Sequence, residues 1–170
     1  RYGSDLNFVS TNHRRAVRDT TERLVAKFGP EVNLFYLDMG QDDFVARERR
    51  AGFMDLCRER GLFYNFCRIS KTFQENVDNL MEIKFEKGKA NMIVSPTAFV
   101  TGAVLRMAYL RNMQMGKDFH YSDFDNANAL ENTGVAIPSV LQDYAAMGRE
   151  AAAAMKNMIQ NPVQIYIPHR

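Results

Sequence analysis

The alternation of two hydrophobic patterns along the chain limits its fold more than any other feature. Short runs such as residues 32–39 (VNLFYLDM) are almost continuously apolar, which is typical of strands buried on both faces. Between these runs lie stretches with apolar residues at helical spacing. Strands separated by helices of this length need crossover connections. The sequence therefore predicts an α/β fold, a parallel sheet flanked by helices.

The predicted elements follow one another in a regular order. The strand-like runs are residues 32–39, 62–69, 91–95, 119–124 and 163–167. The helical stretches are one ending at Phe28, one from Asp42 or Asp43 to about Arg60, one from Ser70 to about Gly88, one from Pro96 past Leu110, and one from about Val140 to Gln160. Gly29 and Gly61 are expected to end the first two helices, and an aspartate to cap the second.

Composition and charge exclude several classes of protein. A length of 170 residues fits one compact domain. The 22 basic and 20 acidic side chains give a net charge of +2, so this segment is not expected to bind nucleic acid by itself. The basic clusters 13–15 and 47–50 are expected to be exposed helix faces. No window holds the roughly 18 apolar residues of a membrane span, and no secretory leader is present.

The motifs that would indicate catalysis are absent. The sequence contains no GxGxxG, GxxxxGK[ST], HExxH or GxSxG stretch. The histidines His13, His120 and His169 are scattered, so no metal site is predicted. Cys57 and Cys67 do not form a CxxC pair and are expected to be buried free thiols in a reducing compartment. The chain is therefore predicted not to be an enzyme and to need no cofactor.

In a parallel sheet, ligands usually bind beyond the carboxyl ends of the strands. The residues that follow the predicted strands are Met39-Gly40, Ile69-Ser70, Ser95-Pro96-Thr97 and Asp125-Asn126. These positions are the candidate binding residues from topology alone.

Three stretches of the sequence carry a family resemblance. They are ARERRAGFMDLCRERG, ANMIVSPTAFVTGAVLRMAYLRNMQMGKDFHYSDFDN and PSVLQDYAAMGREAAAAMKNMIQNP. Together they resemble the effector-sensing domain of lactose-repressor/galactose-repressor (LacI/GalR) type transcription regulators. The resemblance runs from about Val9 to Arg170, and its most specific parts are Arg49-x-x-Gly52-Phe53, Phe124-Asp125-Asn126 and the Gln142-Asp143 pair that leads to Gly148-Arg-Glu-Ala.

The resemblance implies a periplasmic-binding-protein-like type I fold, in which two α/β lobes enclose a cleft. Residues 1–170 would be an effector-binding and dimerisation fragment, mainly the second lobe, with crossover segments at about 1–12 and 140–162. Since the first residue is arginine, we expect a fragment that lacks the DNA-binding head and much of the first lobe. The resemblance implies a cytoplasmic homodimer that contacts DNA only through that head.

Five residues follow as candidate contacts to a small polar effector, which a family likeness suggests is a carbohydrate. Arg49, Asp125 and Gln142 match cleft-facing residues of the family. Two candidates depart from it: Pro96-Thr97 stands where many relatives have Asn-Asp, and Ile69 stands where relatives often have an aromatic ring. The chain also has no tryptophan, so the effector could be a sugar bound differently, another small polar metabolite, or nothing.

Each candidate also has a purely structural interpretation. Arg49 could pair with Asp42 or Asp43 at the helix surface, and Asp125 could cap the loop that follows it. Thr97 could supply a hydroxyl to a helix start, and Gln142 could be an ordinary early helix residue.

Two surfaces of the predicted fold are candidates for contact with another part of the protein or with a second copy. The helix of residues 97–112 is a candidate for the dimer contact, with simple coverage of the sheet as the alternative. The stripe Tyr144, Met147, Ala151, Met155 and Met158 is expected to lack a partner within the chain. At the level of the whole protein, the alternative to a regulator is a solute-binding protein of a sugar transport system.

Overall fold

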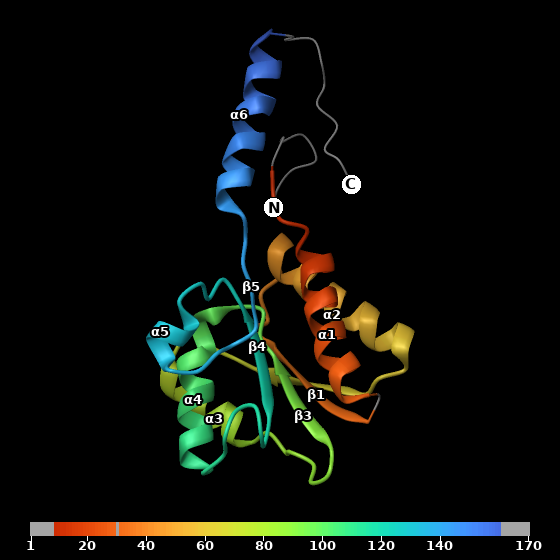
Figure 1. Cartoon of the computed structure of the whole chain (residues 1–170), viewed down its shortest axis with the longest axis vertical. Helices are drawn as coiled ribbons and strands as arrows, with labels where there is room; N and C mark the ends of the chain where they lie inside the picture. The colour runs from red at the N-terminus through yellow and green to blue at the C-terminus, as the bar shows by residue number, and fades with distance from the viewer. Residues whose placement is uncertain (1–8, 30, 161–170) are drawn as a thin grey trace.

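One five-stranded parallel sheet organises the molecule. A computed structural model describes residues 9–29 and 31–160, and in it the strand order is β2-β1-β3-β4-β5 (Figure 1). All neighbouring strands run parallel. The prediction of an α/β fold with a parallel sheet and flanking helices is confirmed.

The strands are short, and the central strands are buried on both faces. They are β1 (Val32–Asp38), β2 (Tyr64–Arg68), β3 (Ala90–Val94), β4 (His120–Phe124) and β5 (Ser139–Val140). The first six residues of β1 are all buried, as its continuous apolar run predicts. The strand predicted for residues 163–167 lies outside the described residues.

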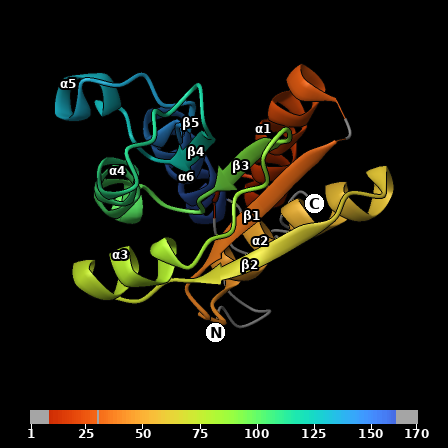
Figure 2. The same ribbon diagram turned by 90° about the horizontal axis from the view of Figure 1, so that it is seen from below.

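Helices cover both faces of the sheet. They are α1 (His13–Phe28), α2 (Phe44–Arg60), α3 (Phe73–Met81), α4 (Thr101–Leu110) preceded by the 3-10 turn η1 (Ala98–Val100), α5 (Ala129–Thr133) and α6 (Tyr144–Gln160). Figure 2 shows α1 and α2 on one side of the sheet and α3 and α4 on the other. Each layer encloses its own apolar core, one centred on Phe53 and Tyr36, the other on Val104 and Met107.

Local capping chemistry sets the bounds of α2. The side chain of Asp43 accepts a hydrogen bond from the backbone N–H of Ala46 at 2.9 Å, so Asp43, not Asp42, is the N-cap. At the other end Gly61 adopts a left-handed conformation with φ of 62°, which costs glycine little. The sequence predicted the end at Gly61 and left Asp42 and Asp43 as alternative caps.

Several predicted helix bounds are wrong. The helix expected from Ser70 begins at Phe73, and the one expected from Pro96 begins as η1 at Ala98. The helix expected to reach Gly88 ends at Met81, because the buried side chain of Asn33 donates to the carbonyl of Lys84 and holds the following segment as a loop. The helix expected from Val140 begins at Tyr144. Val140 instead pairs with Phe124 as part of β5, and Asp143 caps the helix by accepting from Ala146 N–H.

Helix α6 extends away from the sheet (Figure 1). None of its residues is buried, and Tyr144, Met155 and Ile159 are 63%, 62% and 77% exposed. Near its start the Thr11 hydroxyl lies 3.5 Å from the Met147 sulfur, so the segment before α1 contacts the first turn of α6. Within the described residues, no helix combines the length and hydropathy that a bilayer span requires.

Candidate functional site

Four of the five candidate residues gather at the carboxyl edge of the sheet. Thr97 follows β3, Asp125 follows β4 and Gln142 follows β5, while Arg49 reaches the same edge from α2. The Arg49 Nη2 atom lies 3.8 Å from Asp125 Oδ2. Arg49 and Asp125 therefore face each other across this edge instead of lying on opposite sides of the domain.

Arg49 is held on several sides although it carries a charge. It is only 9% exposed, and its Nη1 donates to the Pro96 carbonyl at 2.5 Å. Its guanidinium lies over the Phe124 ring, 3.6 Å from the centroid, a favourable cation–π arrangement. Burial lowers the pKa of Arg49 and the nearby Asp125 carboxylate opposes that shift, so the side chain stays a fixed cation.

The expectation that residues 47–50 form an exposed helix face is wrong for Arg49. Arg47 is the member of the cluster that pairs with Asp42 at the surface, whereas Arg50 pairs with Asp38 at the end of β1. Arg49 and Arg50 therefore point toward the strand ends, and Arg47 points to solvent.

A glycine brings α1 against α2 beside Arg49. A Cβ atom at Gly52 would lie 2.0 Å from the backbone carbonyl oxygen of Arg14, a contact that no side chain can make. One position later, Phe53 is completely buried and its ring lies 4.9 Å from that of Tyr36. The Arg49-x-x-Gly52-Phe53 pattern thus combines a polar contact, a close helix approach and a core ring on one helix face.

The close approach also buries His13, which the sequence analysis placed on an exposed face. His13 is 4% exposed, and its Nδ1 lies 3.4 Å from Arg49 Nε and 3.3 Å from Nη2. Burial, followed by the charge of Arg49, lowers the pKa of His13. Its neighbours Arg14 and Arg15 are exposed as expected and pair with Asp55 and Asp19.

Asp125 adopts an unusual backbone conformation that aims its carboxylate across the edge. Its φ is 63°, in the left-handed region that aspartate tolerates better than most residues. Its backbone N–H donates to Val140 O at 2.8 Å, and its carboxylate accepts from Gln142 Nε2 at 2.6 Å. With 30% of its side chain exposed, Asp125 retains free acceptor positions between Arg49 and Gln142.

A cavity of about 170 Å³ opens next to Arg49, between the loops that follow β1 and β3. Its polar lining consists of Asp38, Gln41, Asp43, Arg49 and Thr97. Thr97 also accepts a hydrogen bond from Phe99 N–H at 3.2 Å, the structural role considered for it, so it both caps η1 and lines the cavity. Asp38 was missed, although the strand-end rule pointed to its neighbour Met39.

Ile69 lies apart from the other four candidates. It is 2% exposed and belongs to the core between the sheet and helices α3 and α4. Of the five candidates, Arg49 and Thr97 line the cavity, whereas Ile69, Asp125 and Gln142 do not.

A buried polar cluster lies directly beneath the Asp125 loop. Asp123 is 2% exposed, and its Oδ2 accepts from Thr101 Oγ1 at 2.7 Å and from Asn126 Nδ2 at 2.6 Å. The Tyr121 hydroxyl lies 2.9 Å from that of Thr101. This cluster ties the start of α4 to the strand-end loop, and the pattern HYSDF gave no sign of it because it reads only as a strand.

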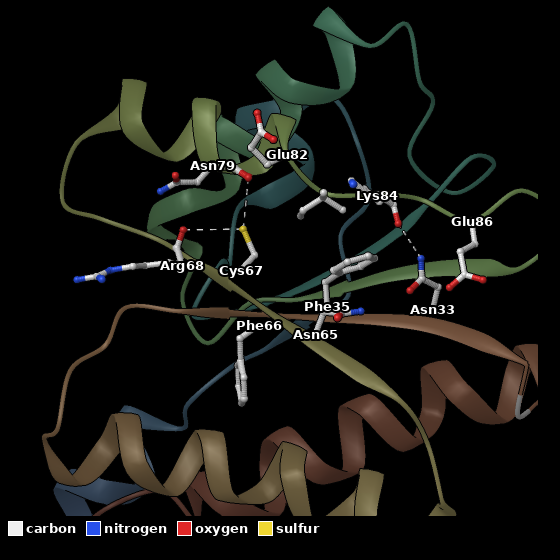
Figure 3. Close-up of a pocket in the computed structure, with 11 residues that line it drawn as sticks. Asn33, Phe35, Asn65, Phe66, Cys67, Arg68, Asn79, Glu82, Lys84 and Glu86 are labelled. Atoms are coloured by element: carbon white, nitrogen blue, oxygen red, sulfur yellow. Dashed lines mark hydrogen bonds between the residues drawn. The ribbon is translucent and has the colours of Figure 1, made fainter.

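A second groove lies elsewhere, on the α3 side of the sheet. It has a volume of about 490 Å³ and is lined by residues of β2, α3 and the loop before β3 (Figure 3). The thiol of Cys67 sits at its floor, where burial raises the pKa to about 11. Burial likewise raises the pKa of Cys57 to about 12, so both cysteines are the buried, unreactive thiols that were predicted.

Comparison with known proteins shows the fold. No family model and no curated protein matches the sequence. A regulatory protein of the LacI family from Chloroflexus aggregans superposes with a TM-score of 0.80 at 19% identity, over 98% of this chain and 62% of that one. A sugar-binding transcriptional regulator of the LacI family from Escherichia coli, complexed with phosphate, gives 0.76 at 18%, over 99% and 60%.

A third structure, the Escherichia coli transcriptional repressor ascG, gives a TM-score of 0.74 at 18% identity, over 94% of this chain and 58% of that one. The chain thus spans about three fifths of the length of each of these proteins. Its five parallel strands and the helices that cover them together have the periplasmic-binding-protein-like fold of LacI-family transcription regulators.

Proposed function

We propose that this chain is the effector-sensing part of a cytoplasmic LacI-type transcription regulator. The observation that carries the proposal is the convergence of Arg49 and Asp125, 3.8 Å apart, at the carboxyl edge of a sheet with the fold of such regulators. An effector bound there would favour one arrangement of the protein over another and so change DNA binding by a head outside this chain.

The chemistry of the edge suits a small polar molecule with several hydroxyl groups. Arg49 presents fixed donors, and its face is covered by Phe124, so little side-chain entropy is lost when a ligand binds. Asp125 and Gln142 supply acceptors and a donor within hydrogen-bonding distance of each other. A carbohydrate has the matching pattern of paired donors and acceptors, and the exposed Tyr144, whose hydroxyl accepts from Gln142 Nε2 at 2.9 Å, lies beside this pair.

The exposed apolar face of α6 is proposed to pack against a first lobe. Residues 1–12 and 140–162 are proposed to cross to a first lobe, with the remaining residues forming mainly the second. Support comes from the length of the three similar proteins, of which the chain spans 58–62%, and from the exposed Tyr144, Met155 and Ile159. An apolar face of this size is stabilised by burial against another surface.

A second exposed surface is proposed to join two copies of the chain. Val100, Val104 and Met107 of η1 and α4 are buried against the sheet, while Phe99, Tyr109 and Leu110 are 57%, 75% and 47% exposed. Phe73 of the neighbouring α3 is 55% exposed. The helix therefore both covers the sheet and offers an apolar outer face for a symmetric contact.

The binding proposal is tested by Arg49→Lys in the full-length protein, with calorimetry against a panel of sugars and nucleobases. Lysine keeps the charge but loses the planar fork, so affinity for the effector is expected to fall about tenfold or more. Arg47→Lys is the matched control, because Arg47 lies two residues away and pairs with Asp42 at the surface. Equal affinity of the Arg49 variant and the control would refute the proposed site.

A further inference from the structure

His13 occupies a position that the proposed function does not explain. It is the first residue of α1 and 4% exposed. Its Nδ1 atom lies 3.3–3.4 Å from the Arg49 guanidinium nitrogens, and its ring centroid lies 5.8 Å from that of Phe124. His13 is therefore a third support of Arg49, beside the Pro96 carbonyl and the Phe124 ring.

The partners of the imidazole determine where its proton lies. Arginine nitrogens can only donate, so Nδ1 must accept with its lone pair. The proton of neutral His13 is then on Nε2, which lies 3.2 Å from the Ser10 hydroxyl. In this tautomer both ring nitrogens have a partner, and the ring can be buried at low cost.

We infer that neutral His13 positions the Arg49 guanidinium in the effector site, and that protonation of His13 releases it. That Arg49 lies in an effector site rests on the proposed function. The contact between His13 and Arg49, and its loss on protonation, concern this chain alone. A proton on Nδ1 would remove the lone pair that Arg49 uses and place two cations 3.3 Å apart. Arg49 would then move toward Asp125, which already lies within 3.8 Å.

The charged groups that face His13 come from two elements. Arg49 of α2 disfavours the protonated form, whereas Asp125 after β4 and Asp43 at the start of α2 favour it. Burial is the largest influence and acts with Arg49, so the net result is a pKa of His13 below its ordinary value. The neutral form therefore predominates at neutral pH in the folded chain.

The direction of the pH dependence follows from linkage. In the unfolded chain His13 binds a proton below about pH 6.5, while in the folded chain it stays neutral to a lower pH. Between these two values the unfolded state holds more protons, so folding stability falls as pH falls through this range. His120 has its pKa lowered by burial and by Lys27, and it contributes in the same direction. A variant of His13 is needed to separate the two.

The first test is NMR of this chain without ligand. Long-range nitrogen couplings are expected to show His13 as the Nε2–H tautomer at neutral pH. The Arg49 Nε–H resonance is expected to shift with the same midpoint as the His13 titration. His13→Asn places an amide oxygen near the position of Nδ1 and does not titrate, so it should keep the Arg49 resonance in place and make it independent of pH.

His13→Ala and His120→Asn complete the set. The alanine variant removes the acceptor and should mobilise Arg49 at every pH, whereas the His120 variant should leave the Arg49 titration intact. An Nδ1–H tautomer, or an Arg49 resonance that ignores the His13 titration, would overturn the inference. A merely space-filling role would give the same Arg49 behaviour in the asparagine and alanine variants.

The second test separates the inference from the function that it extends. In the full-length protein, effector affinity is expected to weaken as pH falls from 8 to 5.5, by less than about tenfold because the lowered pKa keeps part of His13 neutral at pH 5.5, and to be independent of pH in His13→Asn. If Arg49→Lys leaves binding unchanged while the NMR coupling holds, the proposed function fails and His13 still positions Arg49. If Arg49→Lys abolishes binding while its resonance ignores His13, only the inference fails.

Discussion

At the scale of single residues, the site depends on a glycine that touches no ligand. Gly52 allows the first turn of α1 to reach α2, because any Cβ there would lie 2.0 Å from the Arg14 carbonyl oxygen. This contact places His13 beside Arg49. The chain offers a natural comparison in Gly148, also inside a helix, where a Cβ would meet nothing within 4 Å.

Gly52→Ala and Gly148→Ala are therefore expected to act in opposite directions. Alanine favours a helix over glycine by about 1 kcal/mol, so Gly148→Ala should raise the free energy of unfolding of this chain slightly. At Gly52 the clash outweighs that gain, and a loss of about 2 kcal/mol or more is expected. Urea denaturation measures both. Equal stabilisation by the two substitutions would mean that α1 does not approach α2 as closely as the structure shows.

The residue scale also shows where the sequence was sufficient. The family pattern pointed to Arg49, Asp125 and Gln142 by residue type and spacing, and the structure brings these three together. His13 escaped notice because a histidine next to two arginines resembles a solvated helix end. Its burial depends on Gly52, which lies 39 positions later in the chain.

At the scale of elements, β4 and α4 are joined by hydrogen bonds between side chains as well as by apolar packing. The Thr101 hydroxyl, at the first turn of α4, donates to the buried Asp123 carboxylate and contacts the Tyr121 hydroxyl. The same carboxylate holds Asn126, next to Asp125. A shift of α4 would therefore displace the strand-end loop through two hydrogen bonds, Thr101 to Asp123 and Asn126 to Asp123.

Thr101→Val tests how much the hydrogen bond from Thr101 to Asp123 contributes to the free energy of unfolding. It keeps the shape of the side chain but leaves a buried carboxylate with one donor fewer, which should cost about 1–3 kcal/mol of unfolding free energy. Thr21→Val is the control, since Thr21 is equally buried and its hydroxyl donates only to the Val17 carbonyl within its own helix. Urea denaturation should give the larger loss for Thr101, and equal losses would show that the cluster adds nothing beyond an ordinary buried hydroxyl.

At the scale of the whole molecule, two exposed apolar surfaces would be stabilised by burial against a partner. One is the outer face of α4 with Phe73 and Phe99, and the other is the face of α6. The first is proposed to bind a second copy of the chain, the second a first lobe. Each proposal makes a separate prediction because the two faces lie on different helices (Figure 1).

Leu110→Asp is expected to shift a dimer toward monomer in sedimentation experiments, because a charge placed in an apolar interface loses its hydration. Phe63→Asp is the control: Phe63 is 92% exposed and lies just before β2, at the far edge of the sheet. An unchanged dimer in Leu110→Asp would remove α4 from the interface.

Ile159→Lys should act differently in two contexts. In this chain Ile159 is 77% exposed, so the substitution should change the unfolding free energy by less than about 0.5 kcal/mol. In the full-length protein a first lobe is expected to bury it, and the loss should reach about 2 kcal/mol. Thermal or urea unfolding of this chain and of the full-length protein measures both losses of unfolding free energy. A small loss in both would mean that α6 does not pack between lobes.

The sequence by itself determined the alternation of strands and helices, the parallel sheet and the ends of α2. These features depend on the period of apolar residues and on capping chemistry, both of which act within a few residues. Only the tertiary structure decided that His13 supports Arg49, that Asp123 ties α4 to the Asp125 loop and that Ile69 is core. Such contacts join residues from separate helices and strands, so they depend on how closely those elements approach, and no local pattern encodes that distance.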